Sequence, residues 1–329
     1  MVLPVKIFVC EFITGGGFNH VDLPESLVRE GTLMRDALLL DLSALPYEII
    51  LTIDARLATQ KLVSTAIIVH EHDDFWQILE QQISNTDMVW LIAPETDHLL
   101  KKLTKLAIKH QKPILGCGLE SIEICSSKYA TYQALSQAEI ETIPTFKMLE
   151  WKKGEGAWLA KPDDGAGCDD TVCFESADEL ASWIGAWNKA TSHVIQPFIE
   201  GKPASISCVM HHGKAYVLSC NTQLISTQKH QLKFNGCVLN DMTANRAAFE
   251  LVANKIAQAM LDLAGYVGID VIVENDKVIV VEINPRLTTS YSGLAEAIGA
   301  NPAALIINTL TQVNNQWPKL EQNVVSLYV

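Results

Sequence analysis

Polar side chains that could bind a metal ion interrupt a segment that otherwise reads as two buried β-strands. Residues 265–286 contain an apolar run that begins at Asp270, a turn near 275–276, and a return run that ends in Glu282-Ile283-Asn284. Because side chains alternate along a strand, Glu282 and Asn284 share one face, and in an antiparallel hairpin Asp270 lies roughly opposite one of them. Facing carboxylates repel unless a cation neutralises them, and carboxylate and amide oxygens suit Mg²⁺. The hairpin therefore predicts a magnesium site held against nucleotide phosphates.

A surface hairpin with solvated acids is the simpler alternative for this segment. The apolar side chains of the return run argue against it; they are Val278, Ile279, Val280, Val281 and Ile283. A strand of this composition is buried, and buried carboxylates need partners. We therefore favour the metal site.

A second candidate consists of a lysine and a loop of small residues. Lys161 ends a strand-like run, and the loop 163–170 that follows contains Gly165, Ala166 and Gly167. A lysine and exposed backbone N–H groups can surround phosphates, although the residue order is not that of a P-loop. A plain turn is the alternative. The four aspartates of the loop suit a phosphate site only if they point away from it or help to hold the metal.

Two further segments could contact a nucleotide. The run Gln196-Pro197-Phe198-Ile199-Glu200 reads as a strand that enters a connection between two lobes. Backbone groups of such a connection can bind a purine edge, while Glu200 takes ribose hydroxyls; a strand end with a turn is the alternative. Lys128 precedes a helix, where a solvent-exposed lysine is the alternative to a phosphate contact.

The N-terminal part offers candidates for substrate binding. Glu11 and three glycines, Gly15, Gly16 and Gly17, follow the first predicted strand without the G-x-G-x-x-G spacing of a dinucleotide site. We interpret the glycines as a close backbone approach to substrate, with a flexible loop as the alternative. Arg35 could pair bidentately with a substrate carboxylate, or it could form an ion pair with an acid of its own helix.

The pattern around these segments predicts an α/β protein. Residues 1–118 alternate strand-like runs with helical ones, which is typical of an open parallel sheet. The strands are expected at 6–10, 47–53, 66–69, 88–93 and 113–116, and the helices at 23–42, 73–84 and 96–110. Residues 119–197 predict a small α+β lobe. Residues 198–329 predict a larger antiparallel sheet with helices, among them an amphipathic helix at 244–264.

Length, charge and cysteine content limit the class of protein. A chain of 329 residues predicts two or three domains. The net charge of -13 argues against nucleic acid and anionic membranes as partners. The 8 cysteines include no C-x-x-C pair, as expected for reduced thiols. With no signal-peptide pattern and no membrane-spanning run, we expect a cytoplasmic protein.

The order of the candidates resembles the ATP-grasp superfamily of carboxylate–amine ligases over roughly residues 120–300. The resemblance implies that Lys128 and Lys161 contact ATP phosphates, that 163–170 is a mobile loop over them, and that residues 196–199 flank adenine. It also implies that Glu200 binds ribose. Asp270, Glu282 and Asn284 would bind Mg²⁺, as two ions for which Mn²⁺ substitutes, and Arg286 would stabilise the transferred phosphate. Lys161 and Arg286 are then the catalytic residues. The loop aspartates depart from the family pattern, as does Gly268, where some ligases have arginine.

The resemblance implies a reaction in which ATP phosphorylates a small carboxylic acid and an amine attacks the acyl phosphate. The segments EFITGGG and 30–38 further resemble the ligases that join glutamate to tyramine. Three alternatives stay open: a small-molecule kinase on the same fold, a non-catalytic nucleotide-binding protein, and a dinucleotide oxidoreductase. A homodimer also stays open.

Overall fold

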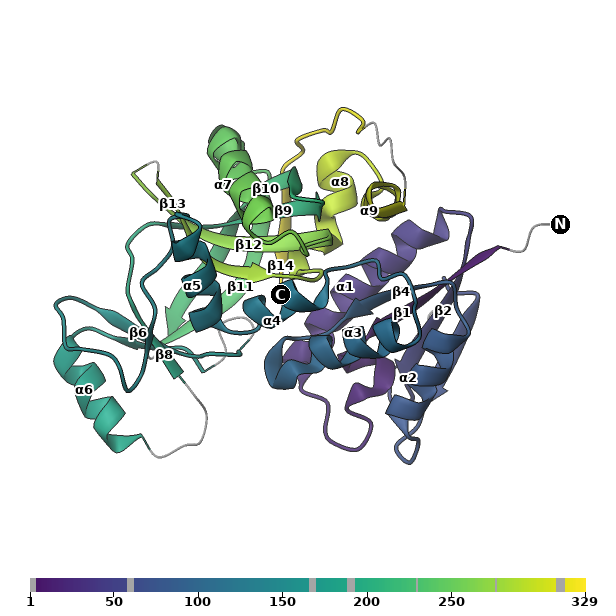
Figure 1. Cartoon of the computed structure of the whole chain (residues 1–329), viewed down its shortest axis with the longest axis horizontal. Coiled ribbons are helices and arrows are strands. Elements are labelled where there is room, and N and C mark those ends of the chain that lie inside the picture. The colour runs from purple at the N-terminus through teal and green to yellow at the C-terminus, as the bar shows by residue number, and fades with distance from the viewer. Residues whose placement is uncertain are drawn as a thin grey trace.

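The chain folds around two β-sheets, a parallel one near the N-terminus and a larger antiparallel one that follows (Figure 1). The computed structural model describes residues 4–57, 62–165, 170–187, 193–228, 230–275, 277–311 and 317–329. Ala166 and Gly167 of the predicted phosphate loop lie outside these ranges. The arrangement confirms the predicted α/β class, with an open parallel sheet before an antiparallel one. The predicted boundaries at 118/119 and 197/198 stay predictions.

The N-terminal sheet consists, within the described ranges, of parallel strands in the spatial order β3-β2-β1-β4. They are β1 (Val5–Glu11), β2 (Tyr47–Asp54), β3 (Thr65–Val69) and β4 (Met88–Ile92). Between and after them lie η1 (Ile13–Gly17), α1 (Glu25–Ser43), α2 (Phe75–Ser84), η2 (Thr96–His98) and α3 (Leu99–Lys109). Because β1 and β4 are parallel neighbours, the residues that follow them meet at one edge of the sheet, where α/β proteins place ligands.

The prediction of a fifth strand in this sheet, at 113–116, is wrong. The structure has a single parallel bridge there, between Val89 and Ile114, with Leu115 N donating to Val89 O at 2.8 Å. Pro113 has no N–H group to donate to the neighbouring strand, so the pairing stays one residue long.

A smaller group of helices and short strands follows. Its elements are α4 (Leu119–Cys125), α5 (Lys128–Gln137), β5 (Phe146–Lys147), β6 (Trp158–Pro162), β7 (Val172–Phe174), α6 (Ala177–Ala186) and β8 (His193–Pro197). Trp158, Phe174 and Ile195 form a separate apolar core beneath α6. The predicted N-cap of α6 is confirmed, because the Ser176 side chain accepts a hydrogen bond from Glu179 N. The strands β7, β6, β8 and β5 continue the larger sheet.

The larger sheet has the order β13-β12-β9-β10-β11 before it reaches β7. Its remaining elements are β9 (Lys202–His211), β10 (Lys214–Gln228), β11 (Gln231–Leu239), η3 (Thr243–Asn245), α7 (Arg246–Ala259), β12 (Gly265–Glu274), β13 (Lys277–Asn284), η4 (Thr289–Gly293), α8 (Leu294–Ile298), α9 (Pro302–Thr311) and β14 (Val325–Tyr328). Helix α7 is shorter than the predicted 244–264. It ends at Ala259, and the Asp262 side chain lies against α4, where its Oδ2 accepts a hydrogen bond from Glu120 N at 2.9 Å.

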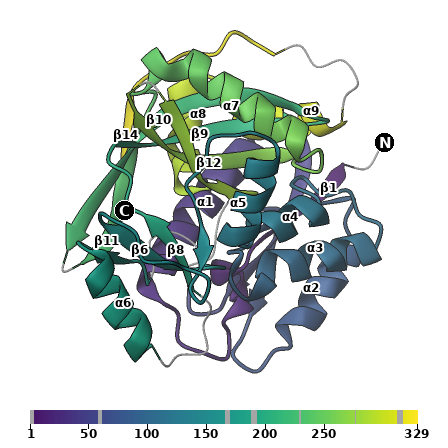
Figure 2. The ribbon, with the colours of Figure 1, turned by 60° about the vertical axis from the view of Figure 1, so that its left-hand side comes forward.

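Several contacts join the two sheets. Helices α4 and α5 lie between α3 and the strand β13 (Figures 1 and 2). On another side, α1 packs against η4 and α9 in a common apolar core that includes Leu38, Leu42 and Ile306. Tyr291 of η4 donates to Asp41 Oδ2 of α1 at 2.8 Å, and burial raises the pKa of Asp41 to about 6. The edge of the N-terminal sheet therefore faces the end of the hairpin β12–β13.

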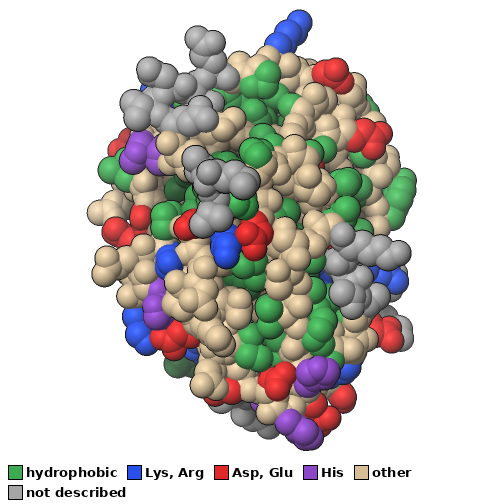
Figure 3. Space-filling model, turned by 90° about the vertical axis from the view of Figure 1, so that its right-hand side faces the viewer, with side chains coloured by type: hydrophobic (Ala, Val, Ile, Leu, Met, Phe, Trp, Pro, Cys, Tyr) green, Lys and Arg blue, Asp and Glu red, His purple; other side chains and the backbone are tan. Residues whose placement is uncertain are grey.

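The surface over the N-terminal sheet carries acidic and basic side chains interspersed with polar and apolar ones (Figure 3). Helix α3 shows how this arises, since Leu99, Leu103 and Ala107 are buried while Lys102 and Lys105 are exposed. Across the described residues, every helix is too short or too polar to span a bilayer.

Candidate active site

The hairpin β12–β13 brings the three predicted metal ligands together. Asp270 pairs with Glu282 and Gly268 pairs with Asn284 in the antiparallel register. Paired residues project to the same face of a sheet. Asn284 Nδ2 accordingly donates to Asp270 Oδ2 at 3.3 Å. The predicted convergence of two carboxylates and one amide is confirmed, whereas their role as metal ligands stays a prediction.

The electrostatics of this cluster fit a divalent cation. Burial and the neighbouring Glu282 carboxylate raise the pKa of Asp270 to about 7, while Asn284, Arg286 and Gln223 oppose the shift. Two acids held this close repel one another, and a hard cation would remove that repulsion. Among the described residues there is no group of three His, Cys, Asp or Glu side chains for a metal. A bound Mg²⁺ would therefore complete its shell with water and phosphate oxygens, as it commonly does.

Gln223 is a member of this cluster that the sequence did not reveal. It lies on β10, and its Nε2 donates to Asp270 Oδ1 at 2.8 Å. No sequence motif marks Gln223, and its strand β10 is not a direct neighbour of β12, since β9 lies between them. Only the order of strands in the sheet brings the two side chains together.

Lys128 lies beside the predicted metal ligands. It begins α5 after the N-cap Ser127, and only 8% of its surface is exposed. Its Nζ donates to Gly165 O and lies 3.7 Å from Glu282 Oε1. The alternative of a solvent-exposed lysine is therefore wrong. The Lys128 ammonium group therefore lies between Gly165, near the start of the predicted phosphate loop, and Glu282 of β13.

Two of the four loop aspartates bind donors of the protein itself. Asp163 Oδ1 accepts a hydrogen bond from Tyr129 N at 2.9 Å, and its Oδ2 accepts one from Ser127 Oγ at 2.8 Å. Asp164 Oδ2 accepts a hydrogen bond from Asp97 N at 3.4 Å. These two acids are thus occupied by the start of α5 and by the N-terminal part. Asp169 lies outside the described residues.

Lys161 and the predicted adenine segment belong to the sheet of the small lobe. In the pairing of β6 with β8, Lys161 is opposite Val194 and Leu159 is opposite Gln196, so Lys161 and Gln196 share one face. Gln196 is buried and donates from Nε2 to Thr145 Oγ1 at 2.9 Å. The structure therefore places these two predicted nucleotide contacts on one surface. Phe198 and Glu200 follow in an exposed connection.

Arg286 follows β13 and is held by an acid that the sequence analysis did not identify. Its Nε donates to Glu95 Oε1 at 2.9 Å, its Nη2 donates to Glu95 Oε2 at 3.0 Å, and its Nη1 donates to Leu287 O at 3.2 Å. Burial lowers the pKa of Arg286, but Glu95 more than offsets this, so the guanidinium stays charged. Glu95 comes shortly after β4, at the edge where parallel strands place ligands, and that position was the available signal.

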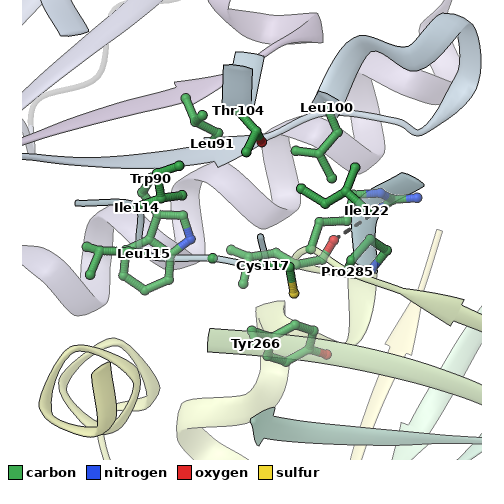
Figure 4. A pocket seen from close by; sticks show the side chains of 13 residues that line it. Trp90, Leu91, Leu100, Thr104, Ile114, Leu115, Cys117, Ile122, Tyr266 and Pro285 are labelled. Atoms are coloured by element: carbon green, nitrogen blue, oxygen red, sulfur yellow. Dashed lines mark hydrogen bonds between the residues drawn. The ribbon is translucent and has the colours of Figure 1, made fainter. Parts of the chain in front are cut away.

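A small cavity lies beside Arg286, between the two sheets (Figure 4). Trp90, Leu115 and Cys117 line it from one side and Tyr266 from the other. Its volume is about 10 Å³, which is room for one water molecule. The cavity is too small for a substrate, and Arg286 is among the residues that line it.

Glu11 serves the local fold at the end of β1. Its carboxylate accepts hydrogen bonds from Thr14 N at 2.7 Å and from Ile13 N at 3.3 Å, and so caps the first turn of η1. Burial raises the pKa of Glu11, and these hydrogen bonds oppose the shift. A Cβ on Gly31 of α1 would lie 2.6 Å from Glu11 Oε2, so the helix provides the space for this carboxylate. A contact of Glu11 with substrate stays a prediction.

The three glycines of η1 are also packed against the protein. A Cβ on Gly16 would lie 2.6 Å from Val69 Cβ, and one on Gly17 would lie 2.5 Å from the Phe12 ring. Gly16 has a φ of 99°, which favours glycine on its own. Gly15 is likewise buried. Packing alone thus accounts for glycine here, and the close approach to substrate stays a prediction.

Arg35 of α1 forms the ion pair expected as its structural alternative, and its contact with a substrate carboxylate stays a prediction. Its Nε donates to Asp36 Oδ1 at 2.8 Å, which is the ion pair on its own helix. The side chain is buried all the same, and within the described residues its Nη1 has no hydrogen-bond partner. The charge of Arg35 also lowers the pKa of Glu11 and so opposes the rise that burial causes. One buried guanidinium donor of Arg35 is thus unpaired among the described residues.

Sequence comparison identifies the family. The profile of the ATP-grasp domain matches residues 125–290, and that of the pre ATP-grasp 3 domain matches residues 47–122. The chain belongs to the ATP-grasp family. This ATP-grasp chain is 28% identical to the tyramine–L-glutamate ligase of Methanocaldococcus jannaschii over 303 residues, which are 89% of this chain and 86% of that protein. It is 33% identical to the ligase of the same name from Methanocaldococcus fervens over 217 residues, 63% of this chain and 61% of that protein.

Solved structures agree on the ATP-grasp fold. A putative ATP-grasp superfamily protein from Archaeoglobus fulgidus has a TM-score of 0.69 at 22% identity, and the match covers 98% of this chain and 99% of that one. The L-amino acid ligase of Bacillus licheniformis has a TM-score of 0.68 at 15% identity, with coverages of 93% and 74%. With the named relatives, these findings confirm the predicted class, an ATP-dependent carboxylate–amine ligase that uses ATP and a divalent metal.

Proposed function

We propose that this protein joins L-glutamate to tyramine in an amide, with ATP converted to ADP and phosphate. The observation that carries the proposal is the 28% identity over 89% of the chain to a tyramine–L-glutamate ligase. The segments EFITGGG and 30–38, which the sequence analysis singled out for this resemblance, lie at the end of β1 and on α1. Both elements border the edge of the N-terminal sheet that faces the hairpin.

The charges of the site suit phosphoryl transfer to a carboxylate. Lys128 and Lys161 would hold the phosphates of ATP, and Asp270, Glu282 and Asn284 would hold Mg²⁺. The metal would neutralise charge on the phosphoryl oxygens when bound. Phosphorylation by ATP makes the carboxylate electrophilic, so the protein does not have to supply a covalent nucleophile. Its main task is to neutralise the charge on the phosphoryl oxygens. Gly165, Gln196 and Glu200 would complete the nucleotide site, with Ala166 and Gly167.

Arg35 would bind the carboxylate of glutamate that is not activated. Its buried Nη1 has no partner among the described residues, although a guanidinium binds carboxylates well. A buried donor without a partner destabilises the folded protein, and a hydrogen bond from Nη1 to a ligand would remove that cost. Glu11 and the glycines 15–17 would form the neighbouring wall.

Further parts of the proposal concern assembly and cofactors. Two Mg²⁺ ions would bind, with Mn²⁺ able to replace them, and the protein would act as a homodimer. The division into 1–118, 119–197 and 198–329 would separate the substrate domain from two ATP-grasp lobes. The cysteines of the described residues are free thiols, which suits a reducing compartment such as the cytoplasm.

The test is a reaction with Mg-ATP, glutamate and tyramine, followed by mass spectrometry and an ADP-release assay. The expected result is the glutamyl–tyramine amide with one ADP for each amide. Product from a different acid and amine would retain the ligase and reject these substrates. Stable phosphorylated acid without any requirement for amine would instead support a kinase.

A further inference from the structure

The turn at residues 95–98 is the part of the N-terminal sheet that reaches the candidate phosphate site. It follows β4 and leads into α3. Asp97 has a φ of 54° and His98 a φ of 57°, so two successive residues other than glycine are left-handed. Such a conformation is unfavourable for both and persists only where the surroundings enforce it, which occurs most often at functional sites. The contacts on either side of the turn show what enforces it.

On one side, Glu95 holds the guanidinium of Arg286. Only 5% of the Glu95 surface is exposed, and its two carboxylate oxygens accept hydrogen bonds from Nε and Nη2 of Arg286 in a bidentate arrangement. Such a pair fixes direction as well as distance. A guanidinium has five N–H donors, and the Glu95 and Leu287 contacts use one on each nitrogen. Among the described residues, one donor on Nη1 and one on Nη2 are left for a ligand.

On the other side, the same turn contacts the start of the phosphate loop. Thr96 Oγ1 donates to Asp164 O at 3.2 Å, and Asp97 N donates to Asp164 Oδ2 at 3.4 Å. The neighbouring Asp163 caps α5, which carries Lys128. One turn of the N-terminal part is thus connected to the arginine after β13 and to the loop beside Lys128.

We propose that Glu95 is a positioning residue that aligns Arg286, so that the two remaining guanidinium donors face the phosphoryl group during transfer. This inference rests on the role proposed above for Arg286. Glu95 does not touch ATP or substrate in this account. It acts through the arginine, and the contacts to Asp164 keep the turn at a constant position relative to the phosphate loop.

The first test compares Glu95→Gln with the wild type and with Glu80→Gln. The amide retains one acceptor but turns an N–H group toward the guanidinium, so alignment is lost. We expect kcat to fall about 10–100-fold, with the KM for ATP changed less than about twofold, since the lysines still hold the nucleotide. Glu80 makes a surface ion pair with Lys109, and Glu80→Gln should behave as the wild type. Unchanged kcat in Glu95→Gln, with a wild-type melting temperature, would overturn the inference.

The second test is a double-mutant cycle with Arg286→Lys. If Glu95 acts through Arg286, adding Glu95→Gln to Arg286→Lys should lower kcat less than about threefold, because the partner is already gone. Fully additive losses would contradict the inference while leaving the role of Arg286 intact. Wild-type kcat in Arg286→Lys alone would instead reject that role, and the inference with it.

A readout without turnover separates this inference from the choice of substrates. The Nε–H resonance of Arg286, assigned by its absence in Arg286→Lys, should exchange slowly in the wild type and rapidly in Glu95→Gln. Slow exchange in both would overturn the inference. If glutamate and tyramine give no amide, the substrate proposal fails, and the cycle is measured on ADP release with the acid and amine that support turnover.

Discussion

The hairpin β12–β13 and the glycine segment after β1 both place polar groups at strand ends, yet they satisfy those groups differently. At the hairpin, Asp270 faces Glu282 directly, and its pKa is raised to about 7 by burial and by that neighbour. After β1, the Glu11 carboxylate accepts two backbone N–H bonds and caps η1. Asp270 also accepts hydrogen bonds, from Gln223 and Asn284, but it faces a second acid, whereas the charge acting on Glu11 is that of the Arg35 guanidinium.

We use this difference to separate the predicted ligand site in the hairpin from a structural one after β1. A cluster of like charges is unfavourable without an external partner, so it persists where a ligand supplies that partner. A carboxylate that caps a helix without a second acid opposite it, and a glycine packed against a side chain, are explained by folding alone. We therefore expect substitutions in the hairpin to change activity and substitutions in the glycine segment to change stability.

The largest expected effect is that of Glu282→Gln. Loss of one charge without a change in volume should lower kcat by about 1,000-fold, while the melting temperature falls little or rises, because repulsion of Asp270 is relieved. Steady-state kinetics measures kcat, and thermal unfolding measures the melting temperature. Glu274→Gln, on the same hairpin opposite Lys277, is the matched control and should retain activity. A stable Glu282→Gln enzyme with wild-type turnover would remove the metal assignment.

Lys128→Met should have the next largest effect. The variant loses the cation between Gly165 and Glu282, so we expect a loss of about 10–100-fold in kcat/KM for ATP. Lys161→Met, on the face shared with Gln196, should be impaired to a similar degree. Lys102→Met, an exposed lysine of α3, is the control. Normal ATP titrations for both site variants would mean that the nucleotide binds elsewhere.

Gly16→Ala tests the structural side of the comparison. A Cβ there meets Val69 at 2.6 Å at a φ of 99°, and we expect a loss of about 2–4 kcal/mol in the free energy of unfolding. Gly156 is the control. Its φ is 84°, and a Cβ there would have no atom within 4 Å, so Gly156→Ala isolates the effect of the backbone angle. Denaturant titration gives both values. A stable Gly16→Ala protein with a raised KM for the acid would reassign this glycine to the substrate site.

Asp41 is an intermediate case, a buried acid with a single internal donor, Tyr291. Its pKa is about 6 in the folded protein, above the ordinary value of 3.8, so the folded state binds the proton more tightly than the unfolded state does. Stability from this group is present below pH 4 and is lost as the pH rises to about 6 and beyond. We expect Asp41→Asn to gain up to about 3 kcal/mol over the wild type across this range. Parallel curves of unfolding free energy against pH would contradict the prediction.

Much of the site was predictable from local pattern. The spacing of Glu282 and Asn284 predicted a shared face, and the strand alternation of residues 1–118 predicted the parallel sheet. Gln223 and Glu95 were not predictable in the same way, because their partners lie 47 and 191 residues away along the chain. Lys128 was predictable in part. The sequence placed it before a helix but did not decide between a buried contact and a solvent-exposed lysine.

The sequence by itself determined the side-chain alternation of each strand and the order along the chain of the predicted metal and nucleotide contacts, because these depend on neighbours within a few residues. It also determined the family, since the ATP-grasp signals are short motifs in a set order. The tertiary structure alone decided which charges are satisfied internally. It brought the end of β4 against the end of β13, and so Glu95 against Arg286, and it packed Gly16 against Val69. Burial and long-range pairing set these outcomes, and both depend on how sheets and helices assemble rather than on local sequence.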